Sequence, residues 1–323
     1  MSQRAFFDEP TPDRQRGAAL LIFMLIFFMA SMSWLLSQTD ALHQRSRADT
    51  ATNLALAQAK EALIGRATTD SNRPGSLPCP DVDDDGKADG NFGFCSASIA
   101  RLPWKTLDLP DLRDGEGDRL WYALADELRD NDDAPPINPT LALGLSLDGT
   151  PNIAAIVFSA GPPLANQDGR PSNDIDDYLD GANQDGSPYV SGPVSPTFND
   201  KAIAISRDQL FKIVNRSVLR LLGADLNRYY EDNGNQYPAS APDLKTSLES
   251  LTLTPETEQE ALTKRIEMLN DNGWFANTTY APAPNRKSAT LITPPSPTPP
   301  DLPDPTSTTC TIALAQKPPC TQP

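Results

Sequence analysis

The longest uninterrupted hydrophobic stretch of this chain lies near its N-terminus, where the 23 residues 17–39 include no charged side chain. The first polar residue is Ser31, whereas a helix in a soluble core would place polar side chains on its outward face. A helix of about 20 residues spans roughly 30 Å, the thickness of a bilayer's hydrocarbon core. A cleaved signal peptide would be shorter and would end in a small-x-small site. The pattern therefore favours a retained transmembrane helix over residues 18–38.

An amphipathic pattern follows over residues 39–66. Small residues recur at spacings of three and four from Ala48 to Ala62, and charged residues occupy the opposite face. No proline interrupts this stretch, and Gly65 is typical of a helix end. We therefore expect one continuous helix over residues 18–66, with a leader, residues 1–17, in front of it.

Shorter hydrophobic stretches separated by turn residues predict an α+β domain with an antiparallel sheet over residues 67–280. Leucines four residues apart predict a helix over 119–128, and the pair Ser206 and Gln209 predicts a capping box at the start of a longer helix. Strands are expected at 153–158, 201–205 and 278–281. Residues 281–323 are rich in Pro, Ser and Thr, which predicts an extended, irregular tail.

The charge of the chain limits the classes of partner. The formal net charge of its 323 residues is −16, and no patch of Lys and Arg with interleaved aromatic residues occurs. An acidic surface repels nucleic-acid phosphates. The sequence therefore argues against nucleic acid as a partner.

All four cysteines follow the hydrophobic stretch, in two close pairs, Cys79 with Cys95 and Cys310 with Cys320. Three connectivities are possible, and proximity favours the two local disulfides. Disulfides persist in oxidising compartments, so the bulk of the chain is expected outside the cytoplasm. Metal binding by the cysteines is the alternative, but no CxxC motif occurs.

An acidic loop lies between Cys79 and Cys95. Four aspartates occupy positions 1, 3, 5 and 9 of a DxDxDGxxD pattern, with Gly86 at the turn: Asp81, Asp83, Asp85 and Asp89. Carboxylates that converge from such a loop suit Ca²⁺, to which Lys87 would add its backbone carbonyl. Phe92 replaces the usual bidentate glutamate, so the loop departs from an EF-hand, and a solvated acidic turn is the alternative. A second acidic stretch, residues 174–185, fits no calcium pattern and is interpreted as a solvated loop.

The sequence argues against an enzyme. His43, next to the hydrophobic stretch, is the only histidine, which excludes a Ser-His-Asp or Cys-His site in the later domain. No HExxH, GxSxG, P-loop or GxGxxG motif occurs. Paired carboxylates remain available for acid–base chemistry, but an acidic loop beside a disulfide explains them more simply.

Residues 14–66 resemble the N-terminal region of type IV pilins and type II secretion pseudopilins. The resemblance is carried by a polar leader that ends in Gln15-Arg16-Gly17, followed by an uncharged apolar helix that continues into an Ala-rich amphipathic half. In that family a prepilin peptidase cuts after the glycine, which implies cleavage after Gly17 and a new N-terminus at Ala18. Most members carry a glutamate five residues after the glycine, where this chain has Ile22. Its absence resembles minor subunits at a filament tip.

The resemblance implies a minor pilin or pseudopilin-like subunit of the inner membrane, with most of the chain in the periplasm or in a filament. Its partners would be other pilin subunits and the prepilin peptidase. A terminal disulfide loop such as 310–320 is also common in that family. The alternatives are an uncleaved single-pass protein with a periplasmic partner-binding domain, and a surface adhesin.

Overall fold

The structure is a computed structural model that describes residues 13–91, 94–131, 134–293 and 311–314. Within these ranges the side chains of residues 13–19, 35–42, 91 and 311–313 are not described. The chain divides into two units, an N-terminal unit, Met1–Ala51, and a C-terminal unit, Thr52–Pro323. The fold is α+β with antiparallel sheets, as the sequence predicts.

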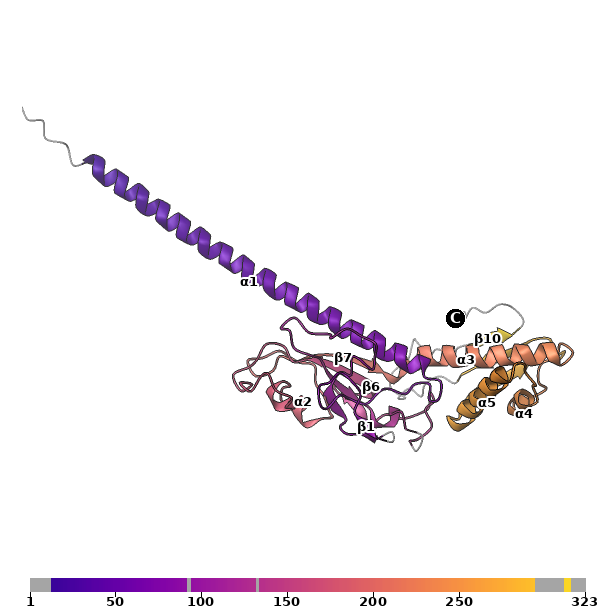
Figure 1. The fold of residues 1–323 in the computed structure, drawn as a ribbon. Coiled ribbons are helices and arrows are strands. Elements are labelled where there is room, and N and C mark those ends of the chain that lie inside the picture. Colours follow the sequence, from indigo (N-terminus) through magenta and orange to yellow (C-terminus); the bar gives the residue numbers. More distant parts are fainter. Residues whose placement is uncertain (1–12, 92–93, 132–133, 294–310, 315–323) are drawn as a thin grey trace, which may run out of the picture. The chain divides into compact units, whose positions relative to one another are not determined.

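Helix α1, Asp13–Thr69, contains the predicted helix 18–66 (Figure 1). It begins earlier than predicted, within the predicted leader, and extends about one turn further at its C-terminal end. Its residues from Thr52 onward belong to the C-terminal unit, where one face is buried: Ala55, Leu56, Ala59, Leu63, Ile64 and Ala67. These positions repeat at spacings of three and four, which place them on one side of a helix. Gly65 lies within the helix, so the predicted end at this residue is wrong.

The proposed membrane span, residues 18–38, falls partly outside the described side chains, which begin at residue 20 and are interrupted at residue 35. Among the described residues, no helix has both the length and the apolarity needed to cross a membrane.

The central sheet of the C-terminal unit has five antiparallel strands arranged around β6, Thr150–Ser159. Ala155–Phe158 of β6 pair with β4, Trp121–Leu124, on one edge and with β7, Lys201–Ser206, on the other. The remaining strands are β3, Ile99–Arg101, beside β4, and β5, Leu145–Leu147, beside the first half of β6. The predicted strands 153–158 and 201–205 are confirmed.

The predicted helix over 119–128 is wrong, because this stretch forms β4 followed by a 3-10 turn, η1, Asp126–Leu128. All four residues of β4 are buried, since the strand lies between β3 and β6 in the sheet. A strand buried on both faces has no alternation of polar and apolar residues. The leucine spacing was therefore not evidence of a helix.

Helix α3, Arg207–Asp232, begins with the predicted capping box, in which the Ser206 hydroxyl accepts from the Gln209 N–H at 3.2 Å. Lys60 connects α1 to β7 and to the start of α3, because its ammonium group donates to the Ala204 carbonyl in β7 and to the Gln209 side chain. Burial lowers the pKa of Lys60.

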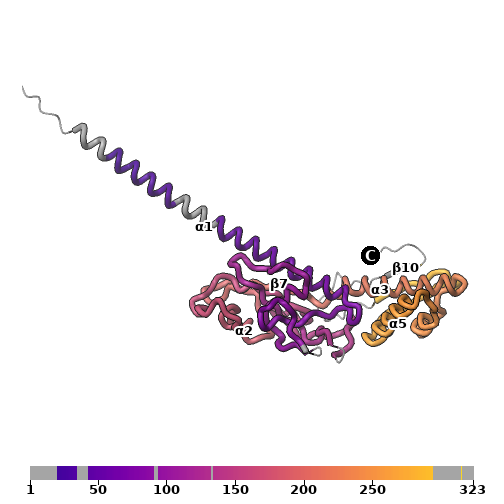
Figure 2. The backbone as a smooth tube through the Cα atoms, in the orientation of Figure 1, coloured from indigo at the N-terminus to yellow at the C-terminus, as the bar shows by residue number. Residues whose placement is uncertain are grey.

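Helices that follow α3 were not predicted: α4, Asp243–Glu249, α5, Glu256–Asp271, and α6, Trp274–Asn277. Helix α3 contacts α4, and α4 contacts α5. Figure 2 labels α3 and α5 on the backbone tube. Gly273 precedes α6 with φ of +70°, a backbone conformation that glycine adopts without strain.

A second antiparallel sheet has the order β10-β9-β8, from β8, Thr279–Pro282, β9, Ala289–Ile292, and β10, Thr311–Leu314. Strand β8 matches the strand predicted at 278–281. Strands β9 and β10, however, lie where the sequence indicated an irregular tail. They pair residue for residue over four positions, and Leu291 and Leu314 are buried, so a few apolar residues suffice to dock these strands onto the unit.

The remaining short elements are β1, Gly90–Asn91, and β2, Phe94–Cys95, which pair with each other, η2, Ile175–Asp177, and α2, Ala182–Asp185.

Leu63→Ala should destabilise the C-terminal unit, because Leu63 is fully buried on α1 and its truncation leaves a cavity. Such truncations cost about 2–5 kcal/mol. Leu54→Ala is the matched control, since Leu54 lies on the same helix and is 58% exposed. Denaturant unfolding of both variants measures the difference, and equal losses would contradict the packing of α1 described here.

Candidate functional site

The acidic loop is fixed at both ends. The disulfide between Cys79 and Cys95 closes it, as predicted for this pair. Asp81 also exchanges two backbone hydrogen bonds of 2.9 Å with Arg101 at the end of β3. The start of the loop is therefore held against the central sheet. Cys310 and Cys320 lie outside the described residues.

Within the loop, backbone N–H groups point at the aspartate side chains. The Gly86 N–H donates to Asp81 Oδ2 at 2.7 Å, and the Asp85 N–H donates to Asp83 Oδ1 at 3.0 Å. Gly86 has φ of +90°, and a Cβ there would lie 2.7 Å from the Trp104 indole. Only glycine satisfies both the conformation and the close approach.

The Asp89 side chain, at the end of the turn, hydrogen-bonds to the backbone at its start. Its Oδ2 accepts from the N–H groups of Val82, at 2.6 Å, and Asp83, at 3.1 Å. As a result, one carboxylate oxygen from each of Asp81, Asp83 and Asp89 lies within 4.8 Å of the others. The fold thus brings together three of the four aspartates that the sequence singled out.

Asp85 is held differently. Its Oδ1 accepts from the Lys87 N–H at 2.7 Å, and Lys87 Nζ lies 3.5 Å from Oδ2. The hydrogen bond from the Lys87 N–H keeps the pKa of Asp85 below its ordinary value. Asp85, the fourth aspartate of the predicted set, does not belong to the group of three. The predicted role of the Lys87 carbonyl stays a prediction.

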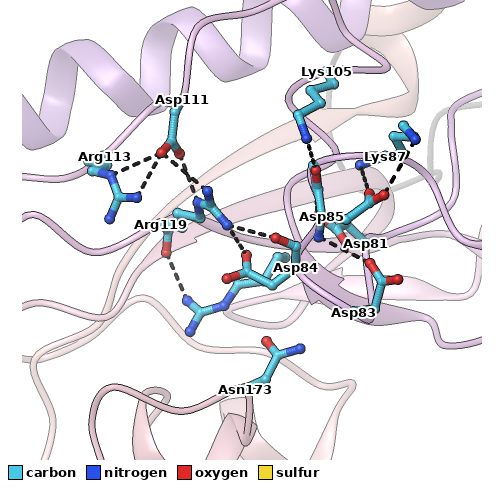
Figure 3. A network of polar contacts seen from close by, with 12 residues as sticks. Asp81, Asp83, Asp84, Asp85, Lys87, Lys105, Asp111, Arg113, Arg119 and Asn173 are labelled. Atoms are coloured by element: carbon cyan, nitrogen blue, oxygen red, sulfur yellow. Dashed lines mark hydrogen bonds and ion pairs between the residues drawn. The ribbon is translucent and has the colours of Figure 1, made fainter.

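The basic residues around the loop form ion pairs or hydrogen bonds with other aspartates, namely Asp84, Asp85 and Asp111 (Figure 3). Arg119 lies 2.8 Å from Asp111 and 2.9 Å from Asp84, and it donates to the Asp84 carbonyl at 2.7 Å. Arg113 pairs with Asp111, and Lys105 donates to the Asp85 carbonyl. In the part of the chain that the structure describes, no Lys or Arg forms an ion pair with Asp81, Asp83 or Asp89.

Asp81 is the buried member of the group. Its side chain is 0% exposed, and its Oδ1 accepts no hydrogen bond from any described residue. Burial raises the pKa of Asp81 to about 6, against the N–H groups of Gly86 and Asp84 that lower it, and the charges of Asp84 and Asp89 raise it further. The site thus combines three close carboxylates with a buried, unsatisfied oxygen.

The second acidic stretch differs in part from the predicted solvated loop. Asp174, Asp176 and Asp185 are exposed, as expected. Asp180, in contrast, is buried, and both of its carboxylate oxygens are satisfied: Oδ1 accepts from the Gln167 amide and Oδ2 from the Asn199 N–H, both at 2.8 Å. The packing of the segments around it therefore removes Asp180 from solvent.

Asp200, which the sequence analysis did not single out, is buried beside Asp180. Its Oδ2 accepts from the Asp180 N–H at 2.9 Å and from the Asn183 amide at 2.8 Å, while Oδ1 has no partner among the described residues. Burial, helped by the charge of Asp180, raises the pKa of Asp200 to about 7. No local sequence pattern identifies Asp200 as a buried residue, because its hydrogen-bond partners Asn183 and Asp180 lie 17 and 20 residues before it.

The N-terminal unit presents the other candidate feature. From Leu20 to Trp34 the large apolar side chains of α1 are 53–78% exposed. Gly17 and Ala18, the predicted processing residues, lie outside the described side chains.

No family model, curated protein or solved structure matches this chain.

Asp200→Asn should stabilise the protein at neutral and alkaline pH. The asparagine carbonyl can accept the same two hydrogen bonds, and no charge is then buried. A pKa raised from 3.8 to about 7 means that the folded state binds the proton more tightly than the unfolded chain. The stability contributed by wild-type Asp200 is therefore full below about pH 4 and is lost as the pH rises to about 7.

The advantage of this variant should be close to zero near pH 4 and reach at most about 4 kcal/mol above pH 7, at 1.36 kcal/mol per pKa unit. Free energies of unfolding measured across this range test the difference. Asp176→Asn, which removes an exposed charge, is the control and should show no such trend. A constant offset between wild type and Asp200→Asn would rule out the raised pKa.

Proposed function

We propose that this protein is a minor pilin or pseudopilin-like structural subunit, anchored in the inner membrane by α1 and carrying its C-terminal unit into the periplasm. The observation that carries the proposal is the contrast along α1. The large apolar side chains from Leu20 to Trp34 are exposed, whereas those from Ala55 to Ala67 pack into the C-terminal unit.

Apolar side chains exposed along a helix favour burial against lipid or another protein surface. Burial of apolar surface contributes about 25 cal/mol per Å², so a helix that is apolar on all sides is stabilised by lipid or by other apolar helices. A subunit that begins in the membrane and ends in a filament meets both surroundings in turn. Neighbouring subunits are therefore the partners that suit this helix.

The disulfide supports the proposed location. The bond between Cys79 and Cys95 needs an oxidising compartment to persist, and it lies in the C-terminal unit. The leader that ends in Gln15-Arg16-Gly17 supports processing by a prepilin peptidase, with Ala18 as the mature N-terminus. The role proposed for the C-terminal unit is structural, not catalytic.

Gly17→Leu should abolish processing, because a bulky side chain next to the cut bond does not fit a peptidase that requires glycine there. The measurement is the N-terminal residue of the protein isolated from membranes of its native host. We expect Ala18 for the wild type and Met1 or Ser2 for the variant, together with loss of filament assembly.

Gly65→Leu is the matched control, since Gly65 lies on the same helix and a Cβ there meets nothing within 4 Å. It should still begin at Ala18. A wild-type protein that begins at Met1 or Ser2 would contradict the proposal in favour of an uncleaved single-pass protein. A start near Ala41 or beyond would indicate a removed signal peptide.

A further inference from the structure

We infer that the acidic loop is a Ca²⁺ site, with carboxylate ligands from Asp81, Asp83 and Asp89. This site is independent of the proposed filament role, since it is built entirely within the C-terminal unit.

The first argument is charge. Three carboxylates with oxygens within 4.8 Å of one another repel, and this repulsion grows as water is excluded. The nearby cations do not relieve it. Arg119 and Arg113 are bound to Asp84 and Asp111, and Lys87 is bound to Asp85. The loop thus supplies partners for the aspartates around the group and leaves the group itself for an external cation.

The second argument is the buried oxygen of Asp81. Oδ2 of this side chain accepts from the Gly86 N–H, whereas Oδ1 is buried and has no hydrogen-bond partner among the described residues. An unsatisfied buried carboxylate oxygen is strongly unfavourable. A cation bound between the three carboxylates removes this penalty, because Oδ1 becomes a ligand.

The ligand chemistry selects the ion. All three side chains offer oxygen, and the two nearby sulfur atoms are bonded to each other in the disulfide. Oxygen ligands favour Ca²⁺ or Mg²⁺ over Zn²⁺ and other transition metals. The loop supplies its ligands from positions one, three and nine of an irregular turn. Ca²⁺ accepts such a geometry, whereas Mg²⁺ demands a near-ideal octahedron.

Bound Ca²⁺ would also consolidate the surroundings of the loop, which is docked onto several segments. The Asn173 amide donates to the Val82 carbonyl at 2.5 Å, and the Lys105 N–H donates to the Gly86 carbonyl at 2.7 Å. Arg119, just before β4, contacts Asp84. A cation that fixes the loop therefore stabilises its contacts with these segments, and this is measurable as a rise in melting temperature.

The test uses the full chain, purified in detergent and freed of metal with a chelator. CaCl₂ and MgCl₂ are titrated calorimetrically, and melting is followed with each ion. We expect Ca²⁺ to bind and to raise the melting temperature, with a dissociation constant of about 10⁻⁴–10⁻³ M or tighter, and Mg²⁺ to bind at least about tenfold more weakly. No binding of Ca²⁺ by the wild type, or equal effects of the two ions, would overturn the inference.

Variants locate the ion. Asp83→Asn and Asp89→Asn should each weaken Ca²⁺ binding by about tenfold or more, because each removes a charged ligand. Asp83 is exposed, so its variant is expected to fold even if Asp81→Asn does not. Asp176→Asn removes an exposed charge from the other acidic stretch and should leave the affinity unchanged. Wild-type affinity in the Asp83 and Asp89 variants would place the ion elsewhere and refute the site.

Discussion

Strand β6 hydrogen-bonds to other strands along both of its edges, with β4 and β5 on one side and β7 on the other. Its residues from Ile153 to Ser159 are all buried. The N–H and C=O groups of this buried strand form their hydrogen bonds with the neighbouring strands. A shift of one residue would turn its buried side chains to the other face, so the pairing register is strongly constrained. The rest of the C-terminal unit depends on that constraint, because β7 leads directly into α3 and β4 supports β3 and the acidic loop.

The acidic loop shows how an acidic chain distributes its few cations. The sequence has 43 acidic residues against 27 basic ones, so many carboxylates cannot form an ion pair. Around the loop, arginines and lysines form ion pairs with Asp84, Asp85 and Asp111. Among the described residues, none forms an ion pair with the group of Asp81, Asp83 and Asp89. The same shortage occurs at Asp200, where burial raises the pKa of the carboxyl group to about 7. Buried carboxylates in this fold therefore differ in their partners: Asp225 pairs with Arg265, whereas Asp81 and Asp200 each keep one oxygen without a hydrogen bond from a described residue.

Local sequence patterns predicted several elements well. The helix within 18–66, the strands at 153–158 and 201–205 and the capping box at Ser206 depend on periodicity or on contacts a few residues apart, and all are present. Spacing failed at 119–128, where burial on both faces hides the period of a strand. It also missed β9 and β10, which are stabilised by pairing between residues about 20 positions apart.

For the candidate site, the sequence by itself determined which residues offer oxygen ligands, because the DxDxDG pattern is local and Gly86 forces the turn. It also determined the contrast between the apolar and amphipathic halves of α1. Only the tertiary structure decided that Asp81 is buried with an unsatisfied oxygen, and that Asp180 and Asp200 lie together. Burial and charge partners come from segments far apart in the chain, and no local pattern records them.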